Sequence, residues 1–251
     1  MSFRYVSVDD AIAARGLRMV VVGNVPSPWG EAAKGFFHLK KLDWLAVRLV
    51  YDSEALVAWS GARNAPVVVY DDEPPRTGWE EILLLVERLG GPALLPADDA
   101  ARARALKLAG ICCKPEGLGW SRRLQQVQAA RAGRGGFSER VAGYLGKKYG
   151  YDAEHTPDYG ARVRECLASM AAALRAGGGD YYLGTLTAVD VYSAVFMALF
   201  APLPEEQCRM DPGIREAFSL LDEETRAALD PALLAHRDRM YARHLATPLS
   251  L

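Results

Sequence analysis

The distribution of β-branched residues constrains the fold most strongly, because three short runs of them precede Pro92 and none follows it. The runs lie at 18–23 (RMVVVG), 44–51 (WLAVRLVY) and 64–70 (NAPVVVY). Short apolar runs bounded by turn residues are typical of strands buried in a sheet. Helical patterns follow them, first at Ala33, Phe36 and Phe37, then over 53–60 and over 79–89. The alternation of strand and helix predicts a small α/β layer with a partly parallel sheet.

From Pro92 onward, alanine, arginine and leucine recur at helical spacing, so we expect the second part of the chain to be helical. The predicted helices span 97–109, 121–132, 138–149 and 157–176, and glycine-rich breaks lie at 133–136 and 177–179. The change of pattern places a domain boundary between Pro92 and Asp98. We therefore divide the chain into an N-terminal extension over 1–17, an α/β domain over 18–92, and an all-helical domain with an extended tail over 98–251.

The charges are balanced, since 30 Lys and Arg residues stand against 31 Asp and Glu residues. A net charge of -1 provides no field that would attract nucleic acid or an anionic membrane. A locally basic stretch contains Arg131, Arg134, Arg140, Lys147 and Lys148, and we interpret it as a solvated helix face. The longest apolar stretch, 186–203, is interrupted by Asp190 and is short for a membrane span. We expect a cytoplasmic protein that binds neither nucleic acid nor membrane.

The four cysteines indicate neither a metal site nor a disulfide framework. Cys112, Cys113, Cys166 and Cys208 lack the CxxC spacing and have no histidines at metal-ligand intervals. Four cysteines in 251 residues are also too few to hold a small disulfide-rich scaffold together. We expect buried free thiols and no bound metal.

Residues 186–191 (LTAVDV) contain the most specific local signal of the helical part. Thr187 is placed to cap a helix, and Asp190, three positions later, is placed to reach back to the cap. Leu186 and Val191 have the spacing of a hydrophobic staple. The pattern predicts a structural role for Thr187 and Asp190, namely to begin a buried helix over 188–199.

Three segments, in their order and spacing, resemble a known family. They are Ser27-Pro28-Trp29 at the start of the first helix, Asn64-Ala65-Pro66 at the start of the third strand, and residues 182–190 around the cap. Together with the α/β layer and the helices after it, they resemble the glutathione S-transferase superfamily, in particular its serine-type cytosolic members. The resemblance implies a thioredoxin-like N-terminal domain, an all-α C-terminal domain and a homodimer.

The same resemblance implies that glutathione, as co-substrate, and a small apolar substrate bind in the cleft between the domains. Ser27 would donate a hydrogen bond to the sulfur of glutathione and so favour the thiolate, which is the nucleophile. Ala65, before a cis Pro66, would pair with the cysteinyl part. The predicted glutathione-binding residues are Ser27, Trp29, Lys41, Ala65, Pro66, Gly78 and Trp79.

The sequence departs from the family pattern after the third strand. The family places a Glu-Ser or Gln-Ser pair at the next helix start, where it holds the γ-glutamyl end of glutathione. Here the pair falls on Thr77-Gly78 or on Gly78-Trp79. Backbone N–H groups at that helix start would still accept a carboxylate.

Purely structural roles also fit the predicted site residues. Ser27 before Pro28 also suits a plain helix cap, and Trp29 and Trp79 also suit packing that fills a gap. Lys41 also suits a solvated helix end. The leading hypothesis is a transferase that conjugates glutathione with an apolar electrophile. The alternatives are a non-catalytic ligand-binding or protein-interaction module and an enzyme that uses another thiol.

Overall fold

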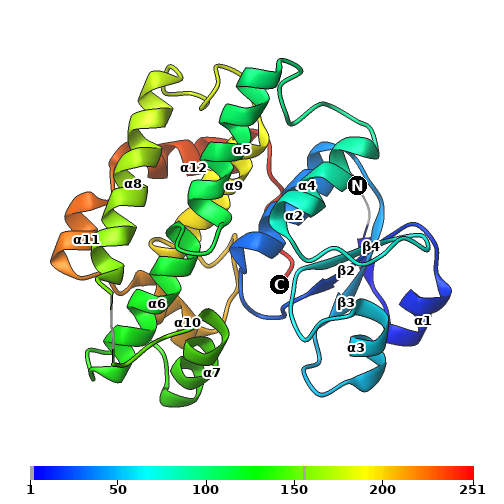
Figure 1. The fold of residues 1–251 in the computed structure, drawn as a ribbon, viewed down its shortest axis with the longest axis horizontal. Helices are drawn as coiled ribbons and strands as arrows, with labels where there is room; N and C mark the ends of the chain where they lie inside the picture. Colours follow the sequence, from blue (N-terminus) through cyan, green and yellow to red (C-terminus); the bar gives the residue numbers. More distant parts are fainter. Residues whose placement is uncertain (1–2, 155–156) are drawn as a thin grey trace.

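A small sheet forms the centre of the N-terminal domain, and helices form the rest of the molecule (Figure 1). The computed structural model describes residues 3–154 and 157–251. Strands β1 (Phe3–Tyr5), β2 (Leu17–Val21), β3 (Trp44–Arg48) and β4 (Val67–Tyr70) lie in the order β1-β3-β2-β4. β1 and β2 are parallel to β3, whereas β4 is antiparallel to β2. The three predicted strands and the partly parallel sheet are thereby confirmed.

Helices cover both faces of this sheet (Figure 1). α2 (Pro28–Leu39) and α4 (Trp79–Arg88) pack on one face, and α1 (Val8–Ala13) and α3 (Glu54–Ser60) pack on the other. All five residues of β2 are buried, as expected for a central strand with both faces covered. Phe36 and Phe37 of α2 are fully buried, which confirms the apolar stripe read from the sequence.

The N-terminal segment contributes to the sheet. β1 and α1 lie within residues 1–17, which the sequence analysis set apart as an extension. Phe3 is opposite Trp44 in the register of β1 and β3, and the two rings stack with centroids 4.6 Å apart. A strand of three residues has too short a pattern to be recognised by its periodicity.

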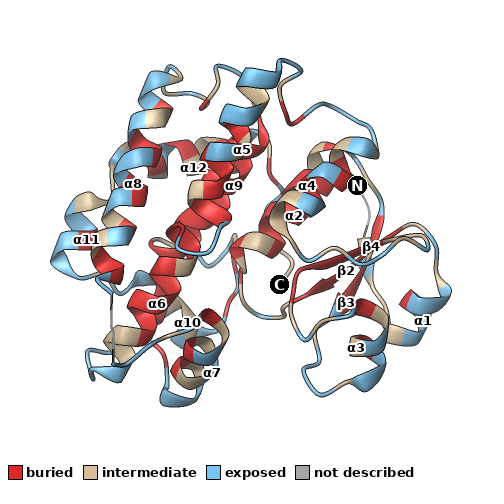
Figure 2. Ribbon diagram, in the orientation of Figure 1, coloured by how far each residue is buried: buried red, intermediate tan, exposed pale blue. Residues whose placement is uncertain are grey.

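The helical domain consists of eight α-helices within the described residues, and one of them lies at its centre. The helices are α5 (Asp99–Cys113), α6 (Leu118–Arg131), α7 (Glu139–Tyr149), α8 (Tyr159–Ala176), α9 (Ala188–Phe196), α10 (Pro212–Ser219), α11 (Glu223–Ala228) and α12 (Pro231–Arg243). Every residue of α9 is buried (Figure 2). The predicted helices are confirmed within a few residues at most ends; the three in the tail were not predicted. No helix in the described part of the chain is long and apolar enough to cross a membrane.

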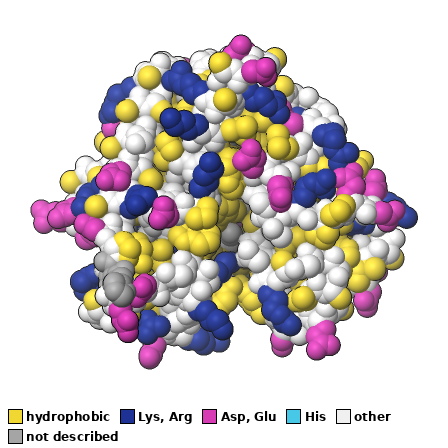
Figure 3. Space-filling model, in the orientation of Figure 1, with side chains coloured by type: hydrophobic (Ala, Val, Ile, Leu, Met, Phe, Trp, Pro, Cys, Tyr) yellow, Lys and Arg dark blue, Asp and Glu magenta, His cyan; other side chains and the backbone are white. Residues whose placement is uncertain are grey.

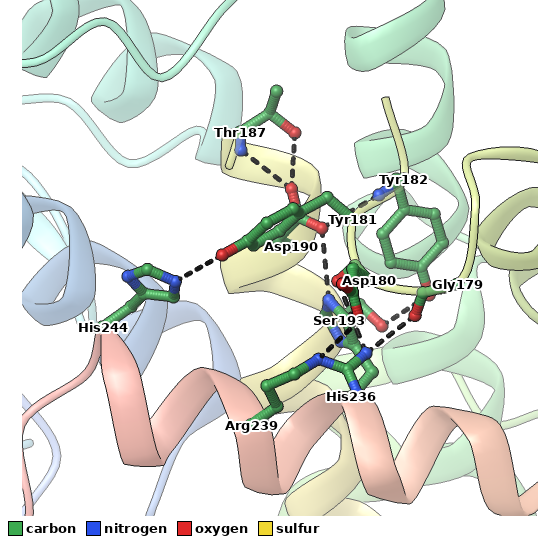
Figure 4. A network of polar contacts seen from close by, with 10 residues as sticks. All are labelled: Gly179, Asp180, Tyr181, Tyr182, Thr187, Asp190, Ser193, His236, Arg239 and His244. Carbon is green, nitrogen blue, oxygen red and sulfur yellow. Dashed lines mark hydrogen bonds and ion pairs between the residues drawn. The ribbon is translucent and has the colours of Figure 1, made fainter. Parts of the chain in front are cut away.

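Asp190 connects α9 to its surroundings through four hydrogen bonds (Figure 4). Its carboxylate accepts from the Thr187 backbone N–H at 2.8 Å and from the Thr187 hydroxyl at 2.9 Å. It also accepts from the Tyr182 backbone N–H at 3.0 Å and meets Nε2 of His236, on α12, at 3.1 Å. Asp190 and His236 are fully buried. One carboxylate thus joins the start of α9, the loop before it and the last helix.

Replacing this carboxylate is expected to destabilise the fold strongly. Asp190→Ala leaves two backbone N–H groups and the His236 ring without an acceptor, so the free energy of unfolding should fall by about 3–5 kcal/mol. The matched control is Asp180→Ala, because Asp180 is 72% exposed and meets Arg239 at 3.5 Å. Its cost should stay below about 1 kcal/mol. Urea denaturation measures both, and equal costs for the two variants would contradict this account of Asp190.

Candidate functional site

A cleft of about 260 Å³ lies between the two domains. One side is formed by α2, the segment before β4 and the start of α4; the other is formed by α5, α6, α7 and α9. Figure 3 shows hydrophobic side chains gathered along the seam between the domains. Six of the seven predicted glutathione-site residues line this cleft, namely Ser27, Trp29, Ala65, Pro66, Gly78 and Trp79. The Ala65-Pro66 peptide bond is cis.

Lys41, the seventh predicted residue, does not line the cleft. It is exposed just beyond the end of α2, in the left-handed backbone region with φ 54°. Its neighbour Lys40 is buried, where Nζ pairs with Glu87 at 2.8 Å and donates to the Gly90 carbonyl at 2.7 Å. Lys40 therefore joins α2 to the end of α4 and is not directed to a ligand.

Ser27 occupies the N-cap position of α2 but does not cap the helix with its side chain. Its backbone carbonyl accepts the first helical hydrogen bond, from the Glu31 N–H at 2.8 Å, and Pro28 follows as the first helical residue. No cap hydrogen bond to the Ser27 hydroxyl is present among the described residues. Ser27 lines the cleft at the positive end of the helix dipole.

Trp29 and Trp79 line the cleft and also join the domains. The Trp29 ring meets Phe196 of α9 edge-on at 5.0 Å, and its Nε1–H donates to the Cys113 carbonyl at 3.2 Å. The Trp79 ring meets Tyr192 edge-on at 5.7 Å, and the Tyr192 hydroxyl donates to the Trp79 carbonyl at 3.0 Å. Both side chains therefore pack between the domains and also border the cleft.

The start of α4 differs from the family pattern in its chemistry. Gly78 is the N-cap, and its N–H donates to Oε2 of Glu81 at 3.1 Å. Thr77 and Gly78 both line the cleft, so a hydroxyl precedes the cap. The remaining N–H groups of the first turn have no partner within the helix itself, which makes them suitable for a carboxylate.

Two further groups in the cleft are held in their neutral forms. Burial raises the pKa of the Cys113 thiol well above its usual value, and the neighbouring Cys112 adds to the effect. Burial likewise raises the pKa of Tyr192. Neither group is anionic at neutral pH, so neither is a strong nucleophile there.

Lys148 of α7 also lines the cleft, and the sequence analysis did not identify it as a site residue. Its Nζ reaches across the domain boundary and donates to Oδ1 of Asn64 at 2.6 Å. None of the described residues that line the cleft is an Asp or Glu. Asn64 precedes the predicted Ala65-Pro66 pair, but nothing in the sequence indicates that α7 lies against it. The contact between Lys148 and Asn64 forms only when the chain folds, so no local sequence pattern predicts it.

A larger pocket of about 590 Å³ lies within the helical domain, and its buried Arg122 and Gln125 side chains are hydrogen-bonded to the protein itself. Arg122 there donates to Oε1 of Gln125 at 2.7 Å and to the Leu220 carbonyl at 2.6 Å. Gln125 in turn donates to Asp222 at 3.0 Å. No predicted site residue lines this pocket. We therefore regard the interdomain cleft as the functional site.

Solved structures resemble this architecture over nearly the whole chain, whereas no family model and no curated protein matches the sequence.

A glutathione S-transferase from Methylobacterium radiotolerans, in complex with glutathione sulfonate, has 22% identity and a TM-score of 0.61, covering 90% of this chain and 91% of that one. One from Xanthobacter autotrophicus has 19% identity and a TM-score of 0.58, with 94% and 98% covered. One from Methylobacillus flagellatus, with glutathione bound, has 13% identity and a TM-score of 0.55, with 91% and 96% covered. The chain has the glutathione S-transferase fold.

This result confirms the predicted fold class, a thioredoxin-like domain followed by an all-α domain. The cleft lies between these two domains, and Ser27 and the cis Pro66 line it. Because one fold supports many activities, the function is argued from the residues of the cleft.

The burial of the thiols predicts that the cysteines react slowly in the native protein. All four cysteines are buried and free, and burial raises the pKa of Cys112, Cys113 and Cys208 and of the less deeply buried Cys166. A disulfide reagent such as Ellman's reagent, which reacts with thiolates, should modify few or none of them in the native protein at neutral pH. It should modify all four in denaturant. Rapid modification of Cys113 in the native protein would contradict its assignment as an inert thiol.

Proposed function

We propose that the protein binds glutathione in the interdomain cleft and transfers it to an apolar electrophile, with Ser27 stabilising the thiolate. The observation that carries this proposal is that Ser27 lines the cleft at the start of α2, while its hydroxyl makes no cap hydrogen bond among the described residues. A serine that served only to cap the helix would direct its side chain to the backbone of the first turn.

The chemistry requires a lowered pKa at the sulfur of glutathione. A hydrogen bond from the Ser27 hydroxyl and the positive end of the α2 dipole both favour the thiolate over the thiol. The thiol loses its proton to solvent, and the thiolate then attacks the electrophile. Trp29, Trp79 and Tyr192 supply apolar surface for that substrate.

The peptide part of glutathione finds matching groups on the N-terminal side of the cleft. The Ala65 backbone, before the cis Pro66, suits pairing with the cysteinyl residue. The Thr77 hydroxyl and the first-turn N–H groups of α4 suit the γ-glutamyl carboxylate. Gly78 and Trp79 lie at the same helix start.

One observation favours a second candidate, a non-catalytic ligand-binding or interaction module. The carboxylate of Glu81 already accepts from the Gly78 N–H and adds negative charge where the γ-glutamyl carboxylate would bind. In that case the protein would bind glutathione weakly or not at all, and no variant at Ser27 would alter a reaction rate.

We also infer a homodimer in the cytoplasm. The dimer is expected from the resemblance to the family, and four free cysteines support a reducing compartment. Light scattering after size-exclusion chromatography measures the assembly, and a mass equal to one chain at micromolar concentration would contradict the dimer.

Glutathione binding is the first test of the proposal. Millimolar glutathione should raise the melting temperature, because a ligand that binds only the folded state stabilises it by mass action. Thermal-shift titration measures the effect, and oxidised ascorbate or free glycine at the same concentration serves as a control. A melting temperature that does not move would favour the second candidate.

Ser27→Ala tests the catalytic role, with Ser53→Ala as the matched control. Ser53 is the N-cap of α3 and does accept a hydrogen bond, from the Leu56 N–H at 3.2 Å. Ser27→Ala should lower the rate of conjugation by about a hundredfold and leave the free energy of unfolding nearly unchanged. Ser53→Ala should leave the rate unchanged and cost about 1 kcal/mol of stability. If Ser27→Ala instead left the conjugation rate unchanged and lowered the free energy of unfolding, Ser27 would be only a helix cap and would have no part in the mechanism.

A further inference from the structure

Lys148 stands out among the lysines because its charge lacks a carboxylate partner. Among the described lysines, Lys34, Lys40 and Lys148 are buried or half-buried, and the others are exposed. Lys34 pairs with Glu31 at 2.7 Å, and Lys40 pairs with Glu87 at 2.8 Å. Lys148 donates to the neutral amide oxygen of Asn64 at 2.6 Å, and no described carboxylate lies within ion-pair distance of it.

The described lining of the cleft offers Lys148 no carboxylate partner. No Asp or Glu is among the described residues that line it. An ammonium group has three donors, of which Asn64 accepts one. Removing an ammonium from water without an opposite charge is costly, whereas an anion in the cleft would compensate for that cost.

The surroundings of Lys148 suit a flat apolar group beside the anion. The ammonium lies 5.7 Å from the centre of the Tyr149 ring and 6.0 Å from that of Tyr144. Trp120 meets the Tyr149 ring edge-on at 4.8 Å, and Trp29 lies against Tyr149 at 6.3 Å. A cation therefore lies next to aromatic rings of the helical domain, at the boundary with the N-terminal domain.

We propose that Lys148 binds a carboxylate on the second substrate, so that the cleft takes aromatic electrophiles that carry a carboxylate group. The proposal rests on the proposed function, because it names the substrate class for the same cleft. It assigns Lys148 to the electrophile because the ammonium lies beside the Tyr149 and Tyr144 rings of the helical domain, which suit an aromatic substrate, and contacts the N-terminal domain through the Asn64 amide.

A pair of matched substrates tests this assignment. The anion 4-chloro-3,5-dinitrobenzoate and its neutral methyl ester undergo the same reaction: the glutathione sulfur forms a bond to the ring carbon, the carbon–chlorine bond breaks, and chloride leaves. The thiol proton goes to solvent. The wild type should use the carboxylate more efficiently, relative to each compound's uncatalysed rate, than the ester.

Lys148→Met should lower kcat/KM for the carboxylate by about ten- to a hundredfold, the usual effect of one charged hydrogen bond. The ester should change less than about twofold, since it makes no such bond. Lys147→Met is the matched control, because Lys147 is the exposed neighbour on the same helix and carries the same charge. Lys148→Arg keeps the charge and should retain most of the preference. A Lys148→Met variant that raises KM for glutathione and leaves the preference unchanged would overturn the assignment.

A binding measurement separates failure of this proposal from failure of the proposed function. Quenching of tryptophan fluorescence by 3,5-dinitrobenzoate and by its methyl ester needs neither glutathione nor turnover, and Trp29, Trp79 and Trp120 all line the cleft. Tighter binding of the carboxylate by the wild type, without any turnover, would support the Lys148 site and count against the transferase. Equal binding of both compounds by the wild type would overturn the Lys148 site even if Lys148→Met failed to fold.

The pH dependence of this binding provides a second readout. Burial, and then the charge of Arg123 on α6, lower the pKa of Lys148 to about 8. The other groups that face it are Asn64, Tyr144 and Tyr149, with Tyr51 packed against Tyr144. Burial raises the pKa of Tyr144 and of Tyr149, so both stay neutral. Because the ammonium loses its charge above its pKa, binding of the carboxylate should weaken between about pH 7 and pH 9. Binding of the ester, and of either compound to Lys148→Arg, should not weaken over this interval.

Discussion

Helix α2 packs against the central helix α9, and the position of the cleft depends on that contact. The Phe36 ring meets Tyr192 edge-on at 5.1 Å. The preceding residue, Gly35, allows close approach, because a Cβ there would lie 3.0 Å from Val191 of α9 and from Leu245 in the C-terminal segment. α9 is in turn fixed by the buried carboxylate of Asp190. The start of α2, with Ser27, is therefore held at a defined distance from the helical domain.

The cleft that results has two sides with different chemistry. The thioredoxin-like side supplies backbone and small polar groups, at Ser27, Ala65 and Thr77, which suit a peptide-like thiol. The helical side supplies aromatic rings and the ammonium of Lys148. Buried thiol and phenol groups between them, Cys113 and Tyr192, are kept neutral by desolvation. A thiolate delivered by a ligand is then the strongest nucleophile that this cleft would contain.

Local patterns were sufficient to predict most of the fold and part of the site. Each of these features is set by residues close together in the sequence: the valine-rich strands, the apolar stripe of α2, the helix start at Ser27, Pro66 before β4 and the cap of α9. The structure contains each of them. β1 could not be predicted, because its pairing with β3 through Phe3 and Trp44 joins segments about forty residues apart. The same reason explains why the prediction of a solvated Lys148 is wrong: α7 lies against Asn64, 84 residues earlier in the chain. Lys41 was placed near the ligand by resemblance, but the left-handed turn after α2 leaves it exposed.

The central claim, that Ser27 and the start of α2 stabilise a thiolate, is tested most directly by titrating the thiol of bound glutathione. The ultraviolet absorbance of the thiolate, followed against pH at saturating protein, gives the pKa of that thiol. The account predicts a value at least about one unit below that of free glutathione in the wild type, and a return toward the free value in Ser27→Ala. A bound thiol that titrates as it does in free solution would contradict the account.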